Sequence, residues 1–310
     1  MNGPRVSIVI VSFNAREHLE RCLKAVAGGG REVVVVDNAS ADGSPALVRE
    51  RFPSVRLVEL EENVGFGAAN NVGMEAASGR WLLLLNSDAW PVDDGIERLA
   101  AFAERQPRAG IVGPRLRNPD GSLQPSVRGY PTLWRIATEY LFLRRLAPRS
   151  RALNAFYGGG FDHESVCEVE VLKGAVLLAR REAAEAVGGF DPAYFMYGEE
   201  MDLCYRVREA GWSVAFDPDA EFVHVGGVST GARWGDRPAF GPMRRDQLRG
   251  LLRFLAGHES PRRAEQARRL LVASFRLRSL LFRGEARAAY RATAAWLASA
   301  SAAELTASRG

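Results

Sequence analysis

The chain of 310 residues is 47% hydrophobic and 25% charged, with a formal net charge of +4, a composition typical of a soluble globular protein. This length accommodates one large α/β domain with an appendage, or two small domains. No run of 18 apolar residues occurs, which argues against a membrane-spanning helix, and we expect no signal peptide. The 3 cysteines form no Cys-x-x-Cys pair, which favours reduced thiols in a cytoplasmic protein.

The N-terminal part of the chain alternates predicted strands and helices. Apolar runs and amphipathic spacing predict, in chain order, a strand over Val6–Val11, a helix over Glu17–Ala27, and strands over Val33–Val36 and Val55–Leu60. A polar segment follows each of these strands, namely Ser12–Asn14, Asp37–Ser40 and Asn63–Asn71. Open α/β sheets bind their ligands at the carboxyl ends of their strands, so these segments are candidate binding loops.

A fourth predicted strand, Trp81–Leu85, is entirely apolar, as is typical of a strand buried on both faces of a mainly parallel sheet. Asn86, Ser87 and Asp88 follow it directly. The carboxylate of Asp88 is suited to a hard divalent cation, which commonly bridges protein carboxylates and substrate phosphates. The alternative is that these residues only turn the chain and cap a helix beyond Pro91.

The remainder of the chain is less regular before it becomes helical. We expect a turn at Asn118–Gly121 and then an irregular stretch over residues 122–162 with a helix at Leu133–Leu146. Strands are expected next at Val169–Leu172 and Ala175–Leu178, followed by a helix at Glu199–Ala210. A short strand at Val214–Phe216 should precede a loop through His224. The irregular stretch is either a lid or acceptor loop, or a simple surface excursion.

The order of these blocks resembles the family-2 glycosyltransferases, inverting enzymes of the GT-A fold, and is most similar to their bacterial rhamnosyltransferase-like branch. The blocks that carry the resemblance are Asp37–Ser40, Asn63–Asn71, Leu85–Asp88, Gln124–Arg128, Gly188–Asp191 and Asp202–Cys204. The resemblance, which runs from Val6 to about Thr230, implies a GT-A-like nucleotide-binding sheet flanked by helices, with a helical C-terminal extension. It divides the chain into a glycosyltransferase domain over residues 1–240, with a nucleotide-binding half (1–115) and an acceptor half (116–240), and an extension over residues 241–310.

The resemblance also implies a divalent cation, Mg²⁺ or Mn²⁺, that neutralises a leaving diphosphate. Many family members hold it with an Asp-x-Asp motif, but here Asn86 takes the first position and leaves Asp88 as the acid. A second ligand is therefore expected. His224 is the candidate, because family members similarly place a histidine near the metal; the alternative is a histidine packed at the end of a strand.

Contacts with a nucleotide-sugar are implied for a further set of residues. Asp37 would accept the imide N–H shared by uracil and thymine, unless it only caps the turn that follows. The complete predicted set is Ser12, Asn14, Asp37, Asn63, Asn71, Asp88, Gly174 and Ser229. The Gly65-Phe66-Gly67 segment does not match the dinucleotide-binding fingerprint, which counts against a dehydrogenase.

Transfer of a sugar to a hydroxyl needs a base, and the acidic segment from Glu199 to Asp202 is the predicted source. Family members commonly read Glu-Asp-x-Asp, with the second acid as the base, and this chain has Glu200 there. On a helix Glu199 and Asp202 share a face, while Glu200 is turned by about 100° from Glu199. Ordinary acids of a first helical turn are the alternative, and which of the three is the base stays open.

The C-terminal part of the chain is strongly basic. From Arg244 to Gly310 it has 14 arginines and 5 acidic residues, a net charge of +9, so the rest of the chain carries −5. Helical spacing predicts a broad apolar face formed by Leu270, Leu271, Ser274, Phe275, Leu277, Leu281 and Phe282. Such a helix either binds an anionic membrane surface or packs on the protein itself. No motif supports binding of nucleic acid.

Together these features predict a metal-dependent glycosyltransferase, cytoplasmic or peripheral on the inner face of the cytoplasmic membrane. The resemblance favours transfer of rhamnose from dTDP-rhamnose to a glycan or lipid-linked acceptor in surface polysaccharide synthesis. One alternative is a nucleotidyltransferase, although Ser12–Asn14 supplies no basic phosphate-binding loop. The other is a non-catalytic nucleotide-sugar-binding or membrane-scaffold protein that has lost its base. The oligomeric state is left open.

Overall fold

The computed structural model describes residues 6–147, 150–154, 156, 158, 161–226 and 241–307. The chain divides into two compact units. The first, here called the sheet unit, comprises Met1–Val127, Asp162–Phe195 and Glu200–Trp234. The second, the helical unit, comprises Arg128–Phe161, Met196–Glu199 and Gly235–Gly310. The segment after Val127 therefore groups with the C-terminal helices.

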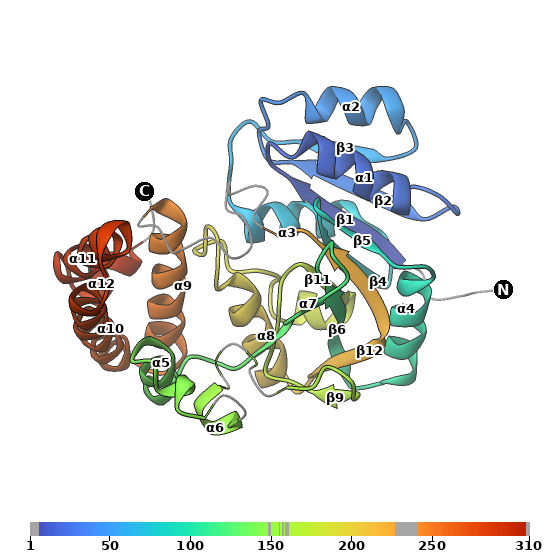
Figure 1. Ribbon diagram of the computed structural model, residues 1–310. Helices are drawn as coiled ribbons and strands as arrows, with labels where there is room; N and C mark the ends of the chain where they lie inside the picture. Colours follow the sequence, from blue (N-terminus) through green and yellow to red (C-terminus); the bar gives the residue numbers. More distant parts are fainter. Residues whose placement is uncertain are drawn as a thin grey trace. The chain divides into compact units, whose positions relative to one another are not determined.

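The sheet unit is built on a mixed sheet with the strand order β3-β2-β1-β4-β11-β6-β12-β5 (Figure 1). Its strands are β1 (Val6–Ser12), β2 (Glu32–Asp37), β3 (Arg56–Glu59), β4 (Trp81–Asn86), β5 (Ala89–Pro91), β6 (Ala109–Arg117), β11 (Val176–Arg180) and β12 (Ser213–His224), with β7 (Leu123–Gln124) paired to β6 and β9 (Cys167–Glu168) paired to β12. The first four strands along the chain are parallel, and β11 runs antiparallel to β4. The predicted parallel nucleotide-binding sheet is thus present as one half of a mixed sheet.

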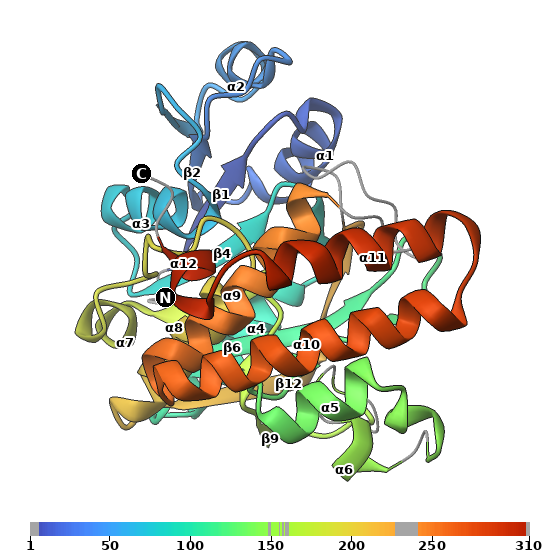
Figure 2. The same ribbon diagram turned by 90° about the vertical axis from the view of Figure 1, so that its left-hand side faces the viewer.

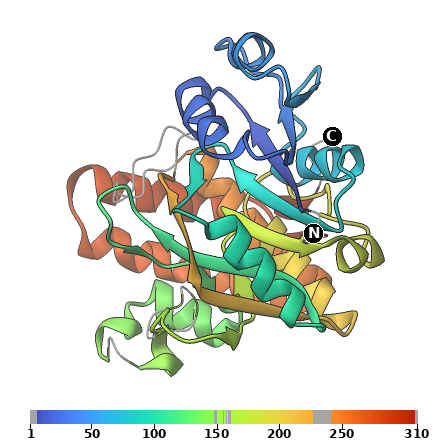
Figure 3. The same ribbon diagram turned by 90° about the vertical axis from the view of Figure 1, so that its right-hand side faces the viewer.

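Helices cover both faces of this sheet. They are α1 (Arg16–Val26), α2 (Ser44–Arg51), α3 (Phe66–Ala76), α4 (Gly95–Arg105), α7 (Arg181–Ala186) and α8 (Glu199–Glu209). Side chains alternate between the faces of a strand, so Ile8 packs in the cluster that contains Leu19 of α1, while Val9 lies against Gly73 of α3. Figure 3 shows α4, in teal, lying across β6 and β12.

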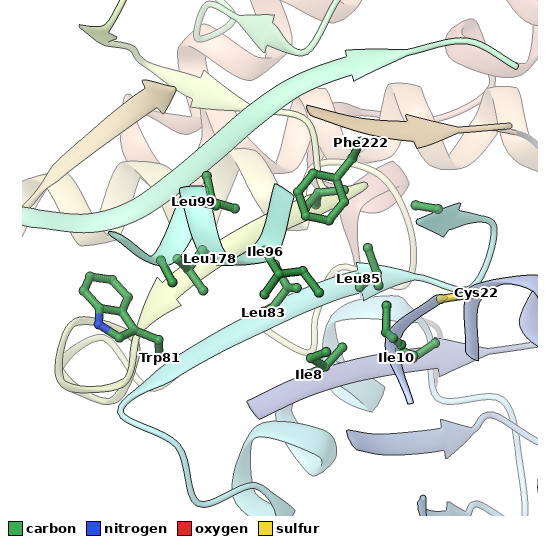
Figure 4. Close-up of a cluster of buried hydrophobic side chains, with 14 of the residues drawn as sticks. Ile8, Ile10, Cys22, Trp81, Leu83, Leu85, Ile96, Leu99, Leu178 and Phe222 are labelled. Carbon is green, nitrogen blue, oxygen red and sulfur yellow. The ribbon is translucent and has the colours of Figure 1, made fainter. Parts of the chain in front are cut away.

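The main core lies between the sheet and the helices α1 and α4. Figure 4 shows Leu83 and Leu85 of β4 together with Ile96 and Leu99 of α4 in this cluster. All the apolar residues of β4 are at most 2% exposed, which confirms that this strand is buried on both faces.

Three predicted elements are wrong in their extent. The short strand expected at Val214–Phe216 is the twelve-residue β12, and His224 is its last residue rather than part of a loop. A shift of register between Asp217 and Glu221 accommodates the polar segment that interrupts the apolar pattern. The helix expected over Leu133–Leu146 ends at Tyr140, because Phe142 adopts a left-handed backbone conformation (φ 63°) before a short 3₁₀ helix, η1 (Leu143–Arg145). Of the strand expected at Val169–Leu172, the last two residues form β10 (Val171–Leu172).

The helical unit contains α5 (Leu133–Tyr140), η1, α6 (Arg151–Asn154), α9 (Pro242–His258), α10 (Pro261–Leu281), α11 (Gly284–Ala298) and α12 (Ala302–Thr306). Along the chain, the boundary between the two units falls within β8 (Val127–Arg128). Figure 2 shows α10 and α11 as an antiparallel pair with α5 beside α10. Buried Leu271 and Phe275 of α10 share a core with Ile136 and Tyr140 of α5 and Leu252 of α9. In the described part of the chain, no helix has both the length and the apolar character needed to cross a bilayer.

Candidate active site

Strand pairing brings the segment after β4 next to the end of β12. After Asn86 the chain turns through Ser87 and Asp88 into β5, which pairs antiparallel with β12 so that Ala89 is aligned with His224. The backbone N–H of Val225 donates to the Asp88 carbonyl oxygen (3.1 Å), and that of Gly226 donates to Asp88 Oδ2 (2.8 Å). The two predicted metal ligands, 136 positions apart in the sequence, are therefore neighbours.

The side chains at this point form a small buried polar cluster. His224 Nε2 lies 3.4 Å from Asp88 Oδ1 and 3.3 Å from Asn86 Nδ2, and Asp88 and His224 are 5% and 4% exposed. Burial alone would raise the pKa of Asp88, but a protonated His224 ring and the Gly226 N–H stabilise the carboxylate and bring its pKa below the ordinary value. Asp88 is therefore ionised at neutral pH.

The cluster fits a divalent cation that is held partly by a substrate. Asn86 Oδ1 is buried and has no hydrogen-bond partner among the described residues, next to one carboxylate oxygen and one imidazole nitrogen. The carboxylate oxygen of Asp88 and the amide oxygen of Asn86 are ligands of the kind that suits Mg²⁺ and Mn²⁺. Within the described ranges, no group of three or more His, Cys, Asp and Glu side chains could hold a metal ion, so phosphate oxygens would have to complete the coordination.

A second group of polar atoms lies at the same edge of the sheet. Ser12 is aligned with Asp37, and Val11 with Asn86, so the ends of β2, β1 and β4 are level. Asp37 Oδ2 accepts from the Ser40 N–H (2.8 Å). Asp37 Oδ1 and Ser12 Oγ are buried and have no hydrogen-bond partner among the residues described. Asp37 therefore caps its turn with one oxygen, and its contact with a nucleotide through the other stays a prediction.

The predicted asparagines hold loops together. Asn14 Oδ1 accepts from the Ala41 N–H (2.8 Å), and Asn63 Oδ1 accepts from the Gly65 N–H (3.0 Å) and from Asn38 Nδ2 (2.9 Å). Asn71 exchanges two hydrogen bonds of 2.8 Å with the backbone of Phe190. Direct contact of Asn14, Asn63 and Asn71 with a nucleotide stays a prediction.

The sequence pattern did not single out Asn38 by itself, although it lies in the Asp37–Ser40 block. Asn38 is 3% exposed and bonds the loop on both sides. Its Oδ1 accepts from the Val64 N–H (3.0 Å), and its Nδ2 donates to Asn63 and to the Gly65 carbonyl oxygen. It shapes the loop before α3.

That loop also contacts the segment before the acidic helix. Gly65 has φ +90°, and a Cβ there would lie 2.4 Å from the Phe195 carbonyl oxygen. The same oxygen accepts from the Phe66 N–H (2.9 Å), the first turn of α3. Only glycine allows this close approach.

The three acids of the predicted catalytic segment are all buried, with Glu199, Glu200 and Asp202 at 5%, 7% and 2% exposed. Asp202 Oδ2 forms an ion pair with Arg206 (2.5 Å to Nη2), and the arginine also donates to the carbonyl oxygens of Val187 and Gly189. Asp202 thus anchors the Gly188-Gly189 turn. Predicted Gly174 lies against Glu200, since a Cβ at position 174 would be 3.3 Å from Glu200 Cβ. Ser229 lies outside the described residues.

A parallel half-sheet with Asp37 and Asp88 at its carboxyl edge, followed by the acidic helix α8, agrees with the GT-A class of glycosyltransferases. The family model described as "Glycosyl transferase family 2" matches residues 7–163. The N-acetylglucosaminyl-diphospho-decaprenol L-rhamnosyltransferase of Mycobacterium tuberculosis is 37% identical over 238 residues, which is 72% of this chain and 77% of that protein. The chain therefore belongs to glycosyl transferase family 2.

Other similarities agree with this assignment. The glycosyltransferase AglE of Haloferax volcanii is 27% identical over 229 residues, which is 71% of this chain and 67% of that protein. The mannosyltransferase PcManGT from Pyrobaculum calidifontis, solved with GDP-Man and Mn²⁺, has a TM-score of 0.55 at 19% identity and covers 99% of this chain and 87% of its own. GalNAc-T7, solved with UDP, GalNAc and Mn²⁺, has a TM-score of 0.56 at 17% identity over 81% of this chain and 48% of its own. These structures confirm the GT-A fold.

Proposed function

We propose that the chain is an inverting, metal-dependent rhamnosyltransferase that uses dTDP-rhamnose and a lipid-linked acceptor in surface polysaccharide synthesis. The observation that carries the metal-dependent chemistry is the buried cluster of Asp88, His224 and Asn86 at the end of β4. The similarity to the M. tuberculosis rhamnosyltransferase supports the sugar and the diphospho-lipid acceptor, because that protein's name contains both.

Each residue then has a distinct task. Asp88 and His224 would hold the cation, which when bound neutralises the charge of the leaving nucleoside diphosphate. Asp37 would accept the imide N–H of thymine at Oδ1. Glu200 would take the proton from the acceptor hydroxyl as that oxygen attacks the anomeric carbon from the face opposite the leaving group.

A membrane-facing role for the helical unit is part of the proposal, in a narrower form than the sequence pattern suggests. Leu271, Ser274 and Phe275 of the predicted apolar face are buried in the core of the unit itself. Leu277, Leu280 and Leu281 at the end of α10 are 42%, 77% and 62% exposed. Exposed Arg276 and Arg283 flank them. Exposed leucines between arginines suit an anionic lipid surface.

A transfer assay with purified protein tests the donor and the acceptor. Radiolabelled dTDP-rhamnose, UDP-glucose and UDP-N-acetylglucosamine are compared with a short-chain N-acetylglucosaminyl-diphospho-polyprenol as acceptor and Mn²⁺ as cation. We expect labelled lipid product from dTDP-rhamnose and little from the uridine donors. Efficient transfer from a uridine donor, with none from dTDP-rhamnose, would contradict the proposed donor.

A further inference from the structure

We propose that Gln124 is a positioning residue that keeps the proton of neutral His224 on Nδ1 and thereby leaves the lone pair of Nε2 directed at the metal cluster. The inference rests on the proposed metal-dependent function. It gives a role to Gln124, the first residue of the Gln124–Arg128 block that resembles the rhamnosyltransferase branch. The contacts around Gln124 carry the inference.

The fold holds Gln124 next to His224 although the two are 100 positions apart. Gln124 lies in β7, which pairs with β6 after a turn in which the Gly121 N–H donates to the Asn118 carbonyl oxygen (2.9 Å). Strand β12 pairs with the other edge of β6, so His224, its last residue, lies at the end of β6 where β7 also pairs. Gln124 is fully buried, with 0% exposed. Its polar atoms therefore need partners within the protein.

Two partners of Gln124 determine which end of the amide is oxygen. Nε2 lies 2.9 Å from the His224 carbonyl oxygen, which can only accept, and 2.7 Å from Asn118 Oδ1. Oε1 lies 2.6 Å from the ammonium of Lys173, which can only donate. Turning the amide over would place nitrogen against the ammonium and oxygen against the carbonyl. The orientation is thus set by groups whose hydrogen-bonding character cannot change.

The orientation of Gln124 in turn determines the tautomer of His224. Gln124 Oε1 lies 2.7 Å from His224 Nδ1 and carries no hydrogen, so Nδ1 must donate. In the neutral ring Nε2 then has the lone pair, and Nε2 is the atom 3.4 Å from Asp88 Oδ1 and 3.3 Å from Asn86 Nδ2. Without the acceptor at Nδ1, the proton could move to Nε2 and be donated to Asp88. That arrangement would occupy both proposed ligand atoms.

The substitution Gln124→Met tests the inference, because it keeps the length of the side chain and removes the acceptor. The tautomer is measured by ¹⁵N NMR of histidine-labelled, metal-free protein at mildly alkaline pH, where free histidine is neutral. We expect the wild-type His224 ring to carry its proton on Nδ1, and the variant to shift toward Nε2. An unchanged Nδ1-protonated ring in Gln124→Met, or Nε2 protonation in the wild type, would overturn the inference.

Binding of Mn²⁺ in the presence of dTDP, measured by calorimetry, gives the second readout. We expect Gln124→Met to weaken this binding by about 10- to 100-fold. The exposed control Gln266→Met should bind as wild type. Equal affinity of Gln124→Met and wild type would count against the positioning role. Wild-type protein that binds no Mn²⁺ with dTDP would instead contradict the proposed metal site, and the NMR measurement would still decide the tautomer.

Discussion

At the scale of residues, the turn after β4 brings its single acid, Asp88, next to His224, and these two side chains are the proposed metal ligands of this family-2 glycosyltransferase. The family resemblance predicts that Asn86 takes the first position of an Asp-x-Asp motif. The structure gives Asp88 a hydrogen bond from the Gly226 N–H and a histidine neighbour at 3.4 Å. Both partners come from the end of β12. The site therefore depends on β12 reaching as far as His224.

Replacing the single acid tests that dependence. Asp88→Ala should abolish both transfer and the Mn²⁺-dependent part of nucleotide binding, because the cation would lose its charged protein ligand. Calorimetry with dTDP, with and without Mn²⁺, measures the effect. Asp94→Ala removes an exposed carboxylate from the same unit and should behave as wild type. Full activity of Asp88→Ala in the presence of chelator would rule out the metal-dependent mechanism.

The base is tested by removing only its ability to accept a proton. Glu200→Gln keeps the size of the side chain, so turnover should fall by about 10²-fold or more while donor binding is retained. Steady-state kinetics and calorimetry measure the two quantities. Asp202→Asn should instead lower the thermal stability, since Asp202 holds Arg206 in an ion pair. Normal turnover of Glu200→Gln together with an inactive Glu199→Gln would move the role to Glu199.

At the scale of elements, the ends of helices are held by loops that come from elsewhere in the chain. The first turn of α3 donates to Phe195, and Asn71 of the same helix pairs with the backbone of Phe190. In the helical unit, Glu265 of α10 accepts from Arg268 and Arg269, and from the Ala302 N–H at the start of α12. The contacts with Phe195, Phe190 and Ala302 join segments that local sequence pattern does not connect, whereas Arg268 and Arg269 lie three and four residues from Glu265 on the same helix.

The contact of Gly65 with Phe195 makes a steric prediction. Gly65→Ala adds a methyl group at 2.4 Å from a carbonyl oxygen in a left-handed conformation, and should lower the free energy of unfolding by about 1–3 kcal/mol. Gly28→Ala is the matched control, because nothing lies within 4 Å of its added Cβ. Chemical denaturation of both variants measures the difference. Equal stability of the two variants would show that the loop before α3 moves away from Phe195 without a loss of free energy, which would contradict the prediction.

The hydrogen bonds of Glu265 make a prediction about pH. The hydrogen bond from Arg268 lowers the pKa of Glu265 most, and those from Arg269 and the Ala302 N–H lower it further, while burial raises it. Together these effects bring the pKa from the ordinary 4.5 to about 2. A lowered pKa stabilises the folded state above pH 4.5, and that stabilisation is lost as the pH falls toward 2. Glu265→Gln should therefore reduce stability at neutral pH by about 1 kcal/mol, since the carboxylate is partly exposed. Denaturation curves should show that the difference in free energy of unfolding between Glu265→Gln and wild type shrinks as the pH falls from 4.5 toward 2. A difference that stays constant over this pH range would contradict the prediction.

At the scale of the whole molecule, charge and exposed apolar surface are concentrated in the helical unit. The basic C-terminal segment carries a net charge of +9, and the end of α10 exposes Leu280 and Leu281. Arg278 belongs to the packed interior of the unit instead. It donates to the carbonyl oxygens of Tyr140 and Glu139, and its guanidinium lies 4.2 Å from the centre of the Phe142 ring. Helical spacing also places Arg278 on the predicted apolar face of α10, and these contacts accommodate the arginine there.

Co-sedimentation with liposomes tests the proposed membrane surface. Wild-type protein should bind vesicles that contain phosphatidylglycerol, and binding should weaken as salt screens the exposed arginines. Replacing both Leu280 and Leu281 by Ser should reduce binding several-fold without unfolding the protein, because both are exposed. Val166→Ser, at an exposed position of the sheet unit, is the control. Wild-type protein that ignores anionic vesicles at low salt would leave only the packing role for α10.

Local pattern was sufficient to predict the parallel half of the sheet, the burial of β4 and the family resemblance, because alternating elements and apolar runs are encoded within short windows. It also predicted Asp88 and His224 as a pair, through the resemblance. Tertiary structure decided the rest. The extent of β12 follows from its pairing with β5 and β6, and the burial of Leu271 and Phe275 follows from the helices around α10. The link from Gln124 to His224 joins residues 100 positions apart, and contacts of this kind depend on strand register and side-chain packing, which no local window of sequence contains.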